Sequence, residues 1–339
     1  MASGRRFSIL PWKSLKKGDF SVRATDQMSE YGGNTLWRRV CQRWQLYLFL
    51  VSPLAWVLIF CYYPMLGVQI AFKDFLPREG IWGSKWEGLV HFQTFFGSFF
   101  FGRTVGNTIR ISLYSLCVSF PLAIIMALMI NLIVNNRFKK AVQTISYMPH
   151  FISTVVLVGM LNQILNPVTG IYGNIYRLFR PGEYPIDILS RGTAFDHLYV
   201  WSGLWQNLGW NTIIYLAALS GVDPTLHEAA QVDGATRLKR VWHVDLPVLL
   251  PTASIMLIMN AGSIMSVGFE KVYLMQNSVN SVYSEVISTY VYKTGLGGTT
   301  NQMSYAAAVG LFNNVINGVL LLAVNFVSNR LSNGANSLF

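Results

Sequence analysis

Charge is what this sequence lacks most clearly. Of its 339 residues only 12% are Asp, Glu, Lys or Arg, whereas 52% are hydrophobic and the mean hydropathy is +0.38. An ordinary soluble domain carries about 25% charged residues, roughly twice this share. The composition therefore excludes a large soluble domain and predicts an all-α integral membrane protein.

Cysteine and histidine are also scarce, and their spacing excludes several kinds of site. The three cysteines, Cys41, Cys61 and Cys117, have no metal-binding spacing, and two of them lie in apolar segments. This pattern favours ordinary packing over a disulfide or a redox site. The five histidines are widely separated along the chain. We therefore expect no metal ion to be bound by this chain.

Two segments approach a catalytic motif without completing it. Gly97–Thr104 has the spacing of a phosphate-binding P-loop, but it is rich in Phe and has Arg103 where the motif needs Lys. His227–Gln231 resembles the start of a zinc-protease helix, yet Gln231 stands where the second His must be. The chain is therefore not expected to be an enzyme, and in particular not to hydrolyse ATP unaided.

Six long stretches contain no charged residue, and each predicts one membrane-spanning helix. A charge at the bilayer centre costs about 2.5–3.5 kcal/mol on insertion scales, and one span needs about 20 apolar residues. The stretches contain 24 to 36 residues, and each of the two longest is interpreted as a helix plus a polar loop. They are Trp44–Phe72, Ile111–Asn136, Ala141–Tyr176, His197–Val222, Leu246–Phe269 and Thr294–Asn329.

The basic residues are distributed unevenly between the two sides that six spans define. Segments on the side of the termini carry 16 of the 26 Lys and Arg residues, and nine of these lie in the tail up to Gln45. Cytoplasmic segments are typically enriched in basic residues, so both termini are expected in the cytoplasm. The net charge of +11 then reports topology and does not indicate nucleic-acid binding.

The chain divides into a basic tail, a membrane domain and a short C-terminal end. The first apolar run starts near Trp44, is longer than the hydrophobic region of a signal peptide and has no Ala-x-Ala site, so no cleavage is expected. Residues 1–43 are predicted to form a cytoplasmic tail with an amphipathic lead-in helix, 44–334 the membrane domain, and 335–339 the C-terminal tail. The predicted spans are 46–71, 107–134, 141–165, 198–221, 247–269 and 304–328.

Residues 222–246 form the longest cytoplasmic loop after the tail, and their pattern predicts a helix, a break and a second helix. Asp223 is a good N-cap, and Pro224 suits the first helical position. Gly234 can adopt the left-handed conformation that ends a helix, and Asp245 is expected to cap the fifth span. A short exposed helix with paired alanines and one acidic residue is typical of a surface that docks a protein.

The same loop contains a long, gapped motif. Glu228-Ala229-Ala230 is followed by Asp233-Gly234-Ala235, then by nine residues between Gly234 and Val244, and then by Leu246-Pro247. The motif and its place before the penultimate span resemble the EAA loop of ABC-importer permeases. Five further segments resemble permeases of carbohydrate importers, most closely the polysaccharide/lipoprotein-type branch. These segments are Tyr63–Val68, Gly88–Phe95, Tyr147–Phe151, Tyr290–Gly295 and Tyr305–Asn313.

The resemblance implies the ABC-importer permease fold and a role as half of a translocation pore for a carbohydrate. A second homologous permease would form the other half, two cytosolic ATPase subunits would hold ATP and Mg²⁺, and an extracytoplasmic binding protein would deliver the sugar. This chain would bind no cofactor and would cross the cytoplasmic membrane of a prokaryote several times. The residues implied in ATPase docking are Glu228, Ala229, Ala230, Asp233, Gly234 and Ala235.

Passage of a sugar needs amide and hydroxyl groups that replace lost water, together with aromatic faces. Several predicted spans supply such residues, although polar side chains in spans also bond helix to helix. Arg103 and Arg110 are interpreted as interfacial anchors instead. The candidate substrate-path residues are Trp205, Gln206, Asn207, Asn211, Asn260, Ser263, Asn313, Asn314 and Asn317.

Two other functions stay open at this point. An ABC importer for a peptide or a phosphorylated polyol would share the EAA loop. An ion-coupled secondary transporter is less favoured, because it needs an ionisable residue inside its spans, and the six stretches contain none.

Overall fold

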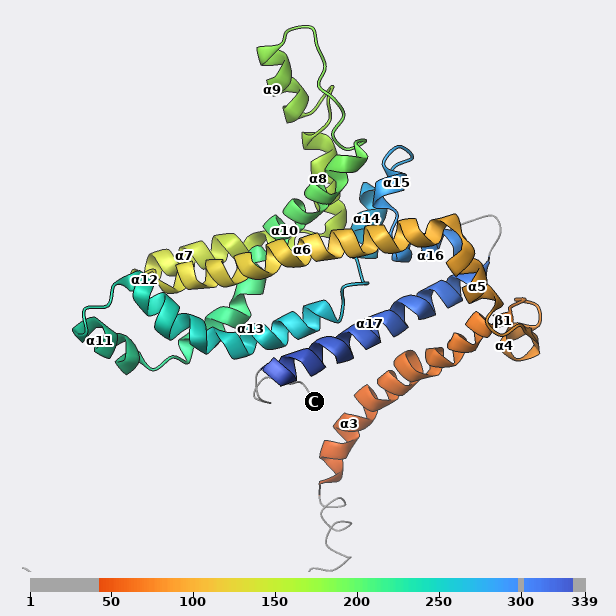
Figure 1. The fold of residues 1–339 in the computed structure, drawn as a ribbon, viewed down its shortest axis with the longest axis horizontal. Helices are drawn as coiled ribbons and strands as arrows, with labels where there is room; N and C mark the ends of the chain where they lie inside the picture. The colour runs from red at the N-terminus through yellow and green to blue at the C-terminus, as the bar shows by residue number, and fades with distance from the viewer. Residues whose placement is uncertain (1–42, 298–301, 332–339) are drawn as a thin grey trace, which may run out of the picture. The chain divides into compact units, whose positions relative to one another are not determined.

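Residues 43–297 and 302–331 are described by a computed structural model, in which helices account for nearly all regular structure (Figure 1). The predictions for the basic tail and its lead-in helix, and for residues 335–339, lie outside this part of the chain. Two compact units are present, one ending at Leu66 and one beginning at Gly67. The predicted all-α class is confirmed, apart from a short antiparallel pair of strands, β1 (Lys73–Asp74) and β2 (Lys85–Trp86).

The first predicted span is a run of three consecutive helical segments. These are α3 (Trp44–Val57), the π-helical η1 (Leu58–Tyr62) and the 3₁₀-helical η2 (Tyr63–Phe72). Residues Tyr47–Phe72 are long and apolar enough to cross a membrane. Most large apolar side chains of α3 are exposed, as is usual for a helix that meets lipid instead of water.

Three further helical runs are also long and apolar enough to cross a membrane. They are α6 (Phe99–Asn131), the run Arg237–Ala261 and residues Met303–Arg330 of α17 (Met303–Leu331). The run Arg237–Ala261 joins α12 (Arg237–Arg240), the π-helical η4 (Val241–Asp245) and α13 (Leu246–Ala261) without a break. These helices correspond to the second, fifth and sixth predicted spans.

The third predicted span, 141–165, is broken in the structure. It comprises α7 (Asn136–Tyr147), the 3₁₀-helical η3 (Met148–Phe151) and α8 (Thr154–Ile164), and the two α-helices are bent by 92°. Pro149 lacks an N–H and limits helix continuation, while the Ser153 side chain accepts the Val156 N–H and starts α8 anew. Counted as one span, this pair gives five spans among the described residues.

The fourth predicted span lies within α10 (Gly192–Ser220), a 29-residue helix that is long enough to cross a bilayer. It is less apolar than the four helical runs named above, because amide, hydroxyl and indole groups recur along it. The count of six spans and the cytoplasmic placement of both termini therefore stay predictions.

Short elements complete the second unit and lie near the ends of the long helices. The remaining helices are α4 (Gly80–Gly83), α5 (Val90–Gly97), α9 (Ile171–Phe179), α11 (Pro224–Val232), α14 (Phe269–Met275), α15 (Ser281–Ser284) and α16 (Ile287–Gly295).

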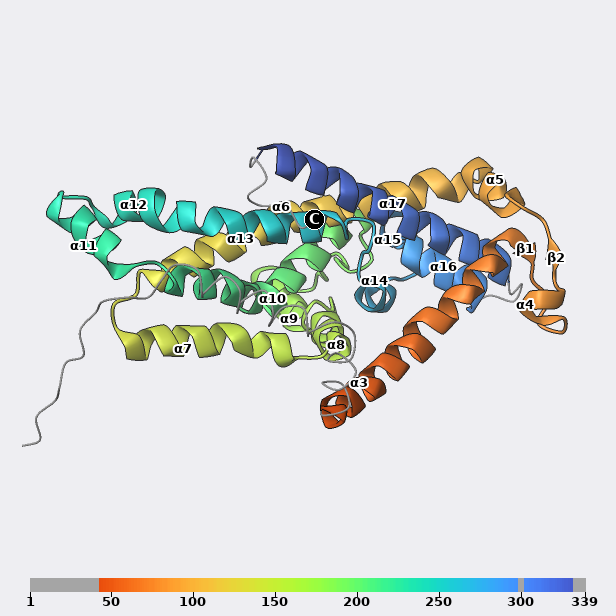
Figure 2. The ribbon, with the colours of Figure 1, turned by 90° about the horizontal axis from the view of Figure 1, so that it is seen from below.

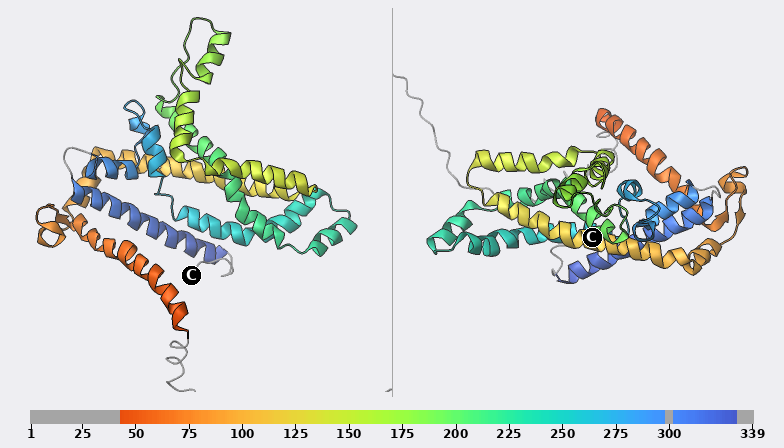
Figure 3. Two further views of the ribbon diagram at one scale, coloured as in Figure 1. Left: turned by 180° about the vertical axis from the view of Figure 1, so that it is seen from behind. Right: turned by 90° about the horizontal axis from the view of Figure 1, so that it is seen from above.

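The loop 222–246 and the segment after Lys73, which are predicted for opposite sides of the membrane, lie at opposite ends of this second unit (Figure 1). The helix α11 and the turn between α6 and α7 lie at one end, and α4, α5 and the two strands lie at the other (Figures 1 and 2). Views from behind and from above show the same separation (Figure 3). The arrangement is the one expected if the loop 222–246 and the segment after Lys73 face different compartments.

The helix α10 packs against α6, α7 and α13 in the interior of the second unit. One apolar cluster joins α6, α10 and α13 through Ala127, Tyr215 and Leu249. The contact with α7 is closer still, because a Cβ atom added at Gly209 would lie 2.1 Å from the Ser146 carbonyl oxygen. Only glycine permits the two backbones to approach this closely.

We expect Gly209→Ala to lower the melting temperature of the purified chain in detergent by several degrees, because overpacking costs about 1–3 kcal/mol. Gly106→Ala in α6 is the control, since a Cβ there meets no atom of this chain within 4 Å and alanine favours helix. Equal melting temperatures for the two variants would contradict the close contact of α7 with α10.

Candidate functional site

The loop 222–246, called the EAA loop below, begins with a capped helix as predicted. Asp223 Oδ1 accepts the Thr225 N–H at 2.9 Å, and Pro224 occupies the first turn of α11. The same hydrogen bond, donated to the charged carboxylate, lowers the pKa of Asp223 below its ordinary value. The start of the helix is thus fixed by residues within the loop itself.

The helix α11 ends in a Schellman motif centred on Gly234. This glycine has φ +74°, the Gly234 N–H donates to the Gln231 oxygen at 3.0 Å, and the Ala235 N–H donates to the Ala230 oxygen at 2.9 Å. The predicted left-handed conformation is confirmed. The chain turns sharply here because glycine adopts a positive φ without steric cost.

The predicted ATPase-docking residues lie together on and just after α11, which is a prerequisite for a docking surface. Glu228, Ala229, Asp233 and Gly234 are exposed, and Ala230 and Ala235 are half-buried. Two large apolar residues on the same helix, Leu226 and Val232, are also exposed. Sequence reasoning missed these two, although exposed apolar side chains on a short polar loop favour a protein partner. Docking itself stays a prediction.

The predicted role of Asp245 as a helix cap is wrong. The helix runs through this position from η4 into α13, and Asp245 has helical φ and ψ with no capping hydrogen bond. Its side chain is only 2% exposed, and its Oδ1 lies 3.2 Å from His227 Nε2 and 3.4 Å from Asn131 Nδ2. Asp245 therefore connects α11 to the ends of α6 and α13, a contact that helix-end rules do not address.

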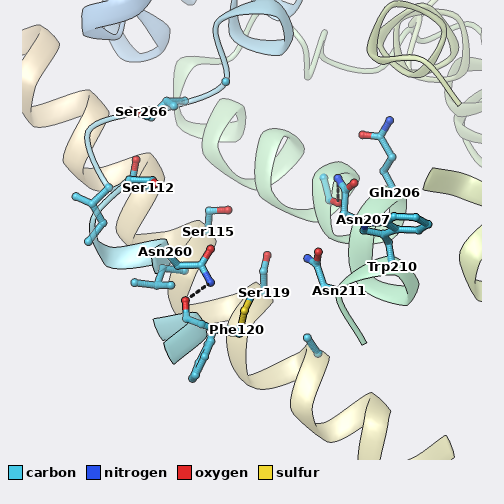
Figure 4. Close-up of a pocket in the computed structure, with 18 of the residues that line it drawn as sticks. Ser112, Ser115, Ser119, Phe120, Gln206, Asn207, Trp210, Asn211, Asn260 and Ser266 are labelled. Carbon is cyan, nitrogen blue, oxygen red and sulfur yellow. Dashed lines mark hydrogen bonds between the residues drawn. The ribbon is translucent and has the colours of Figure 1, made fainter. Parts of the chain in front are cut away.

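A cavity of about 820 Å³ lies between α6, α10, α13 and the segment 263–271. This volume falls within the range of about 300–1,000 Å³ that is usual for small-molecule sites. Ser115 and Ser119 of α6 and Asn211 of α10 point toward one another across it (Figure 4). Asn260 of α13 and Trp210 of α10 also contribute to the wall. The cavity is partly open, and its wall combines hydroxyl, amide and aromatic groups.

The predicted substrate-path residues fall into three groups. Five line this cavity, one lines a second hollow beside α16 and α17, and three line neither. Among the latter, Asn317 is occupied in bonding helix to loop, since its Oδ1 accepts the Met265 N–H at 2.9 Å and its Nδ2 donates to Ser266 Oγ at 2.8 Å. The residues that line the cavity of about 820 Å³ are Gln206, Asn207, Asn211, Asn260 and Ser263. Asn314 lines the second hollow, and Trp205, Asn313 and Asn317 line neither.

Two of the five cavity residues also hold α10 against η3. Gln206 Nε2 donates to the Ile152 oxygen at 2.7 Å, and Asn207 Oδ1 lies 2.9 Å from His150 Nδ1. The His150 ring stacks on Trp210 with a centroid distance of 4.3 Å. These groups are therefore pre-positioned by neighbouring elements, and Asn211 is the more freely available amide.

Sequence reasoning missed the serines of α6, namely Ser112, Ser115 and Ser119, which line the cavity opposite α10. Their spacing of three and four residues places them on one face of a helix. This periodicity could have predicted a polar face on the helix, because three hydroxyls on one face of an apolar span must meet protein or water.

Arg103 and Arg110, which were expected to be interfacial anchors, each form an ion pair; their position relative to the membrane interface stays a prediction. Arg103 pairs with Glu285, and Arg110 pairs with Asp196 through Nε and Oδ2 at 2.6 Å. Both pairs tie the start of α6 to elements distant in sequence. Within residues 43–297 and 302–331, no cluster of three His, Cys, Asp or Glu side chains is placed to hold a metal ion.

Comparisons with known proteins agree with this geometry. Residues 119–333 match the sequence family described as "Binding-protein-dependent transport system inner membrane component". The chain is 39% identical to Protein LplB of Bacillus subtilis over 84% of this chain and 88% of that protein. It is 38% identical to the polygalacturonan/rhamnogalacturonan transport system permease protein YteP of the same organism, over 86% and 90% of the two chains.

A solved structure has the same fold. It is a chain of a bacterial ABC transporter involved in the import of the acidic polysaccharide alginate, with a TM-score of 0.79, 39% identity, and coverage of 88% of this chain and 99% of that one. A second structure shows a bacterial alginate ABC transporter in complex with an alginate pentasaccharide-bound periplasmic protein, with a TM-score of 0.78. The protein is thus a multi-pass membrane transport subunit, and it belongs to the family of binding-protein-dependent transport system inner membrane components, the permeases of ABC importers.

Proposed function

We propose that this chain is one of two permease subunits of an ATP-driven importer that carries an oligo- or polysaccharide across the cytoplasmic membrane of a prokaryote. The observation that carries the proposal is the cavity between α6, α10 and α13, whose wall combines serine hydroxyls, asparagine amides and Trp210. Hydroxyl-rich solutes need such groups to replace their water. The names of the relatives YteP and the alginate importer support the choice of a saccharide.

The proposal includes three kinds of partner. A second, homologous permease completes the pathway, and an extracytoplasmic binding protein delivers the saccharide. The alginate transporter in complex with a pentasaccharide-bound periplasmic protein supports this partner. Two cytosolic ATPase subunits bind ATP and Mg²⁺ and hydrolyse the nucleotide. Each ATPase receives one EAA loop, and the exposed side of α11 supplies the contact.

Transport is driven through the EAA loop. Closure of the ATPase pair on ATP moves α11, and α11 contacts the membrane helices through His227 and Asp245. The exposed Glu228 meets a basic residue of the ATPase, and the small side chains of Ala229 and Ala230 permit close approach. Gly234 provides the sharp turn that returns the chain to the membrane.

The proposed function predicts ATP-dependent uptake of oligosaccharides by the complete transporter in proteoliposomes. A panel of labelled neutral and acidic trisaccharides, a tripeptide and glycerol 3-phosphate is offered together with the binding protein. We expect uptake of at least one trisaccharide, and stimulation of ATP hydrolysis when the binding protein carries it. Uptake confined to the peptide or to glycerol 3-phosphate would reject a saccharide importer.

Charge reversal at α11 is expected to weaken ATPase docking. In Glu228→Lys, a repulsive contact replaces an attractive one, so recovery of the ATPase with the affinity-purified permease should fall about tenfold. Glu270→Lys is the matched control, because Glu270 is also exposed but lies in α14, away from the EAA loop. Equal recovery from both variants would remove Glu228 from the docking surface.

The turn at Gly234 allows a second test of coupling. A β-branched residue at φ +74° is strained, by about 1–2 kcal/mol, whereas asparagine tolerates this conformation. Gly234→Val should therefore insert into the membrane but lose most saccharide-stimulated ATP hydrolysis, and Gly234→Asn should retain most of it. Full stimulation in the valine variant would show that the geometry of the turn is not needed for coupling.

A further inference from the structure

Lys271 contributes the charge in the wall of the cavity. It lies in α14, next to the Gly268 end of the segment that closes the cavity, and its side chain is only 8% exposed. Every other described residue that lines this cavity is uncharged. In the sequence, Lys271 lies just beyond the fifth apolar stretch, Leu246–Phe269.

The ammonium group of Lys271 has no carboxylate partner among the described residues. Its Nζ donates one hydrogen bond, to the Tyr199 oxygen at 2.8 Å, and lies 4.7 Å from the centre of the Tyr199 ring. An ammonium has three N–H donors, and burial of a charge without a counter-charge is unfavourable. Accordingly, burial lowers the pKa of Lys271 to about 8.

Three other basic side chains in this region have a carboxylate partner, which Lys271 lacks among the described residues. Arg103 and Lys293 both pair with Glu285, and Arg110 pairs with Asp196. Lys271 is buried, faces the cavity and has no carboxylate partner in the described part of the chain, so an anion that enters the cavity can supply the missing counter-charge. The cost of burying the ammonium is then offset when the anion arrives.

The surroundings of Lys271 leave room for such an anion. A Cβ atom added at Gly203 would lie 3.0 Å from Lys271 Nζ, and Gly268 also lines the cavity without a side chain. The absence of a side chain at Gly203 leaves space directly beside the ammonium. Further along the same wall, Asn211 and Trp210 offer an amide and an aromatic face, which suit the hydroxyls and the ring of a sugar.

We propose that Lys271 binds the carboxylate of a uronic acid unit in an acidic saccharide as it passes through the cavity. This inference rests on the proposed function and adds a substrate class to it. One carboxylate per sugar unit matches one buried ammonium, and hydroxyl-binding groups in the same wall fit the rest of the unit. Relatives of the chain include permeases whose names refer to acidic polysaccharides, polygalacturonan and alginate.

The test compares uptake of trigalacturonate with uptake of its carboxyl-reduced, neutral counterpart by the complete transporter in proteoliposomes. In Lys271→Met the efficiency of trigalacturonate uptake should fall about tenfold, the usual effect of losing a hydrogen bond to a charged group. Uptake of any neutral saccharide that the wild type carries should stay unchanged. Lys271→Arg retains the charge and should restore most of the uptake of the acidic saccharide.

Lys73→Met is the matched control. Lys73 is also 8% exposed and donates to a carbonyl oxygen, that of Ile81 at 2.7 Å, but it does not line the cavity. Its removal should therefore leave the ratio of acidic to neutral uptake unchanged. A general loss of stability would instead lower uptake of both saccharides and would also be seen in the basal ATP hydrolysis and melting temperature.

Three results would overturn the proposal. One is an unchanged preference for the acidic saccharide in Lys271→Met, another is a wild type that imports only neutral saccharides, and the third is selective loss of glycerol 3-phosphate uptake, which would assign the ammonium to a phosphate. In the first two cases the saccharide importer itself would stand. Absence of any saccharide uptake by the wild type would instead reject the proposed function.

Discussion

The structure depends on the need to keep a polar helix out of hydrocarbon. α10 carries amide and hydroxyl side chains along its length and one carboxylate, Asp196, near its start, and a bilayer offers no water to satisfy them. Neighbouring elements supply the partners instead: Arg110 of α6 pairs with Asp196, the Ile152 oxygen just after η3 accepts from Gln206, and Lys271 of α14 donates to the backbone oxygen of Tyr199. Close backbone contact at Gly209 holds α10 against α7. The cavity lies beside the part of α10 whose polar side chains are not all taken up by these partners.

Features that are encoded locally could be predicted from the sequence. The stretches without charge located the long apolar helices, because transfer of a charge into lipid is costly wherever it occurs. Asp223 and Gly234 fixed the two ends of α11, since an N-cap and a left-handed turn depend on only a few neighbouring residues. The EAA motif was identifiable for the same reason, as its residues all lie within one loop.

Features that depend on contacts between distant segments could not be predicted in this way. Asp245 resembles a helix cap in sequence, yet its environment is set by His227 and Asn131. Asn211 and Asn317 are both polar residues within apolar spans, but one faces the cavity and the other bonds to a loop. Whether a polar residue faces the cavity or bonds to another segment is decided by the neighbour that packs opposite it.

The contact of His227 with Asp245 has a consequence for energy exchange between the two ends of the protein. Asp245 lies in the same uninterrupted helical run as Asn260, which is about 22 Å further along at 1.5 Å per residue. If ATPase binding and cavity occupancy favour the same arrangement of this run, thermodynamic reciprocity requires each to raise the affinity for the other. A saccharide in the cavity would therefore change the affinity of the permease for the ATPase through one helical run, before any nucleotide is hydrolysed.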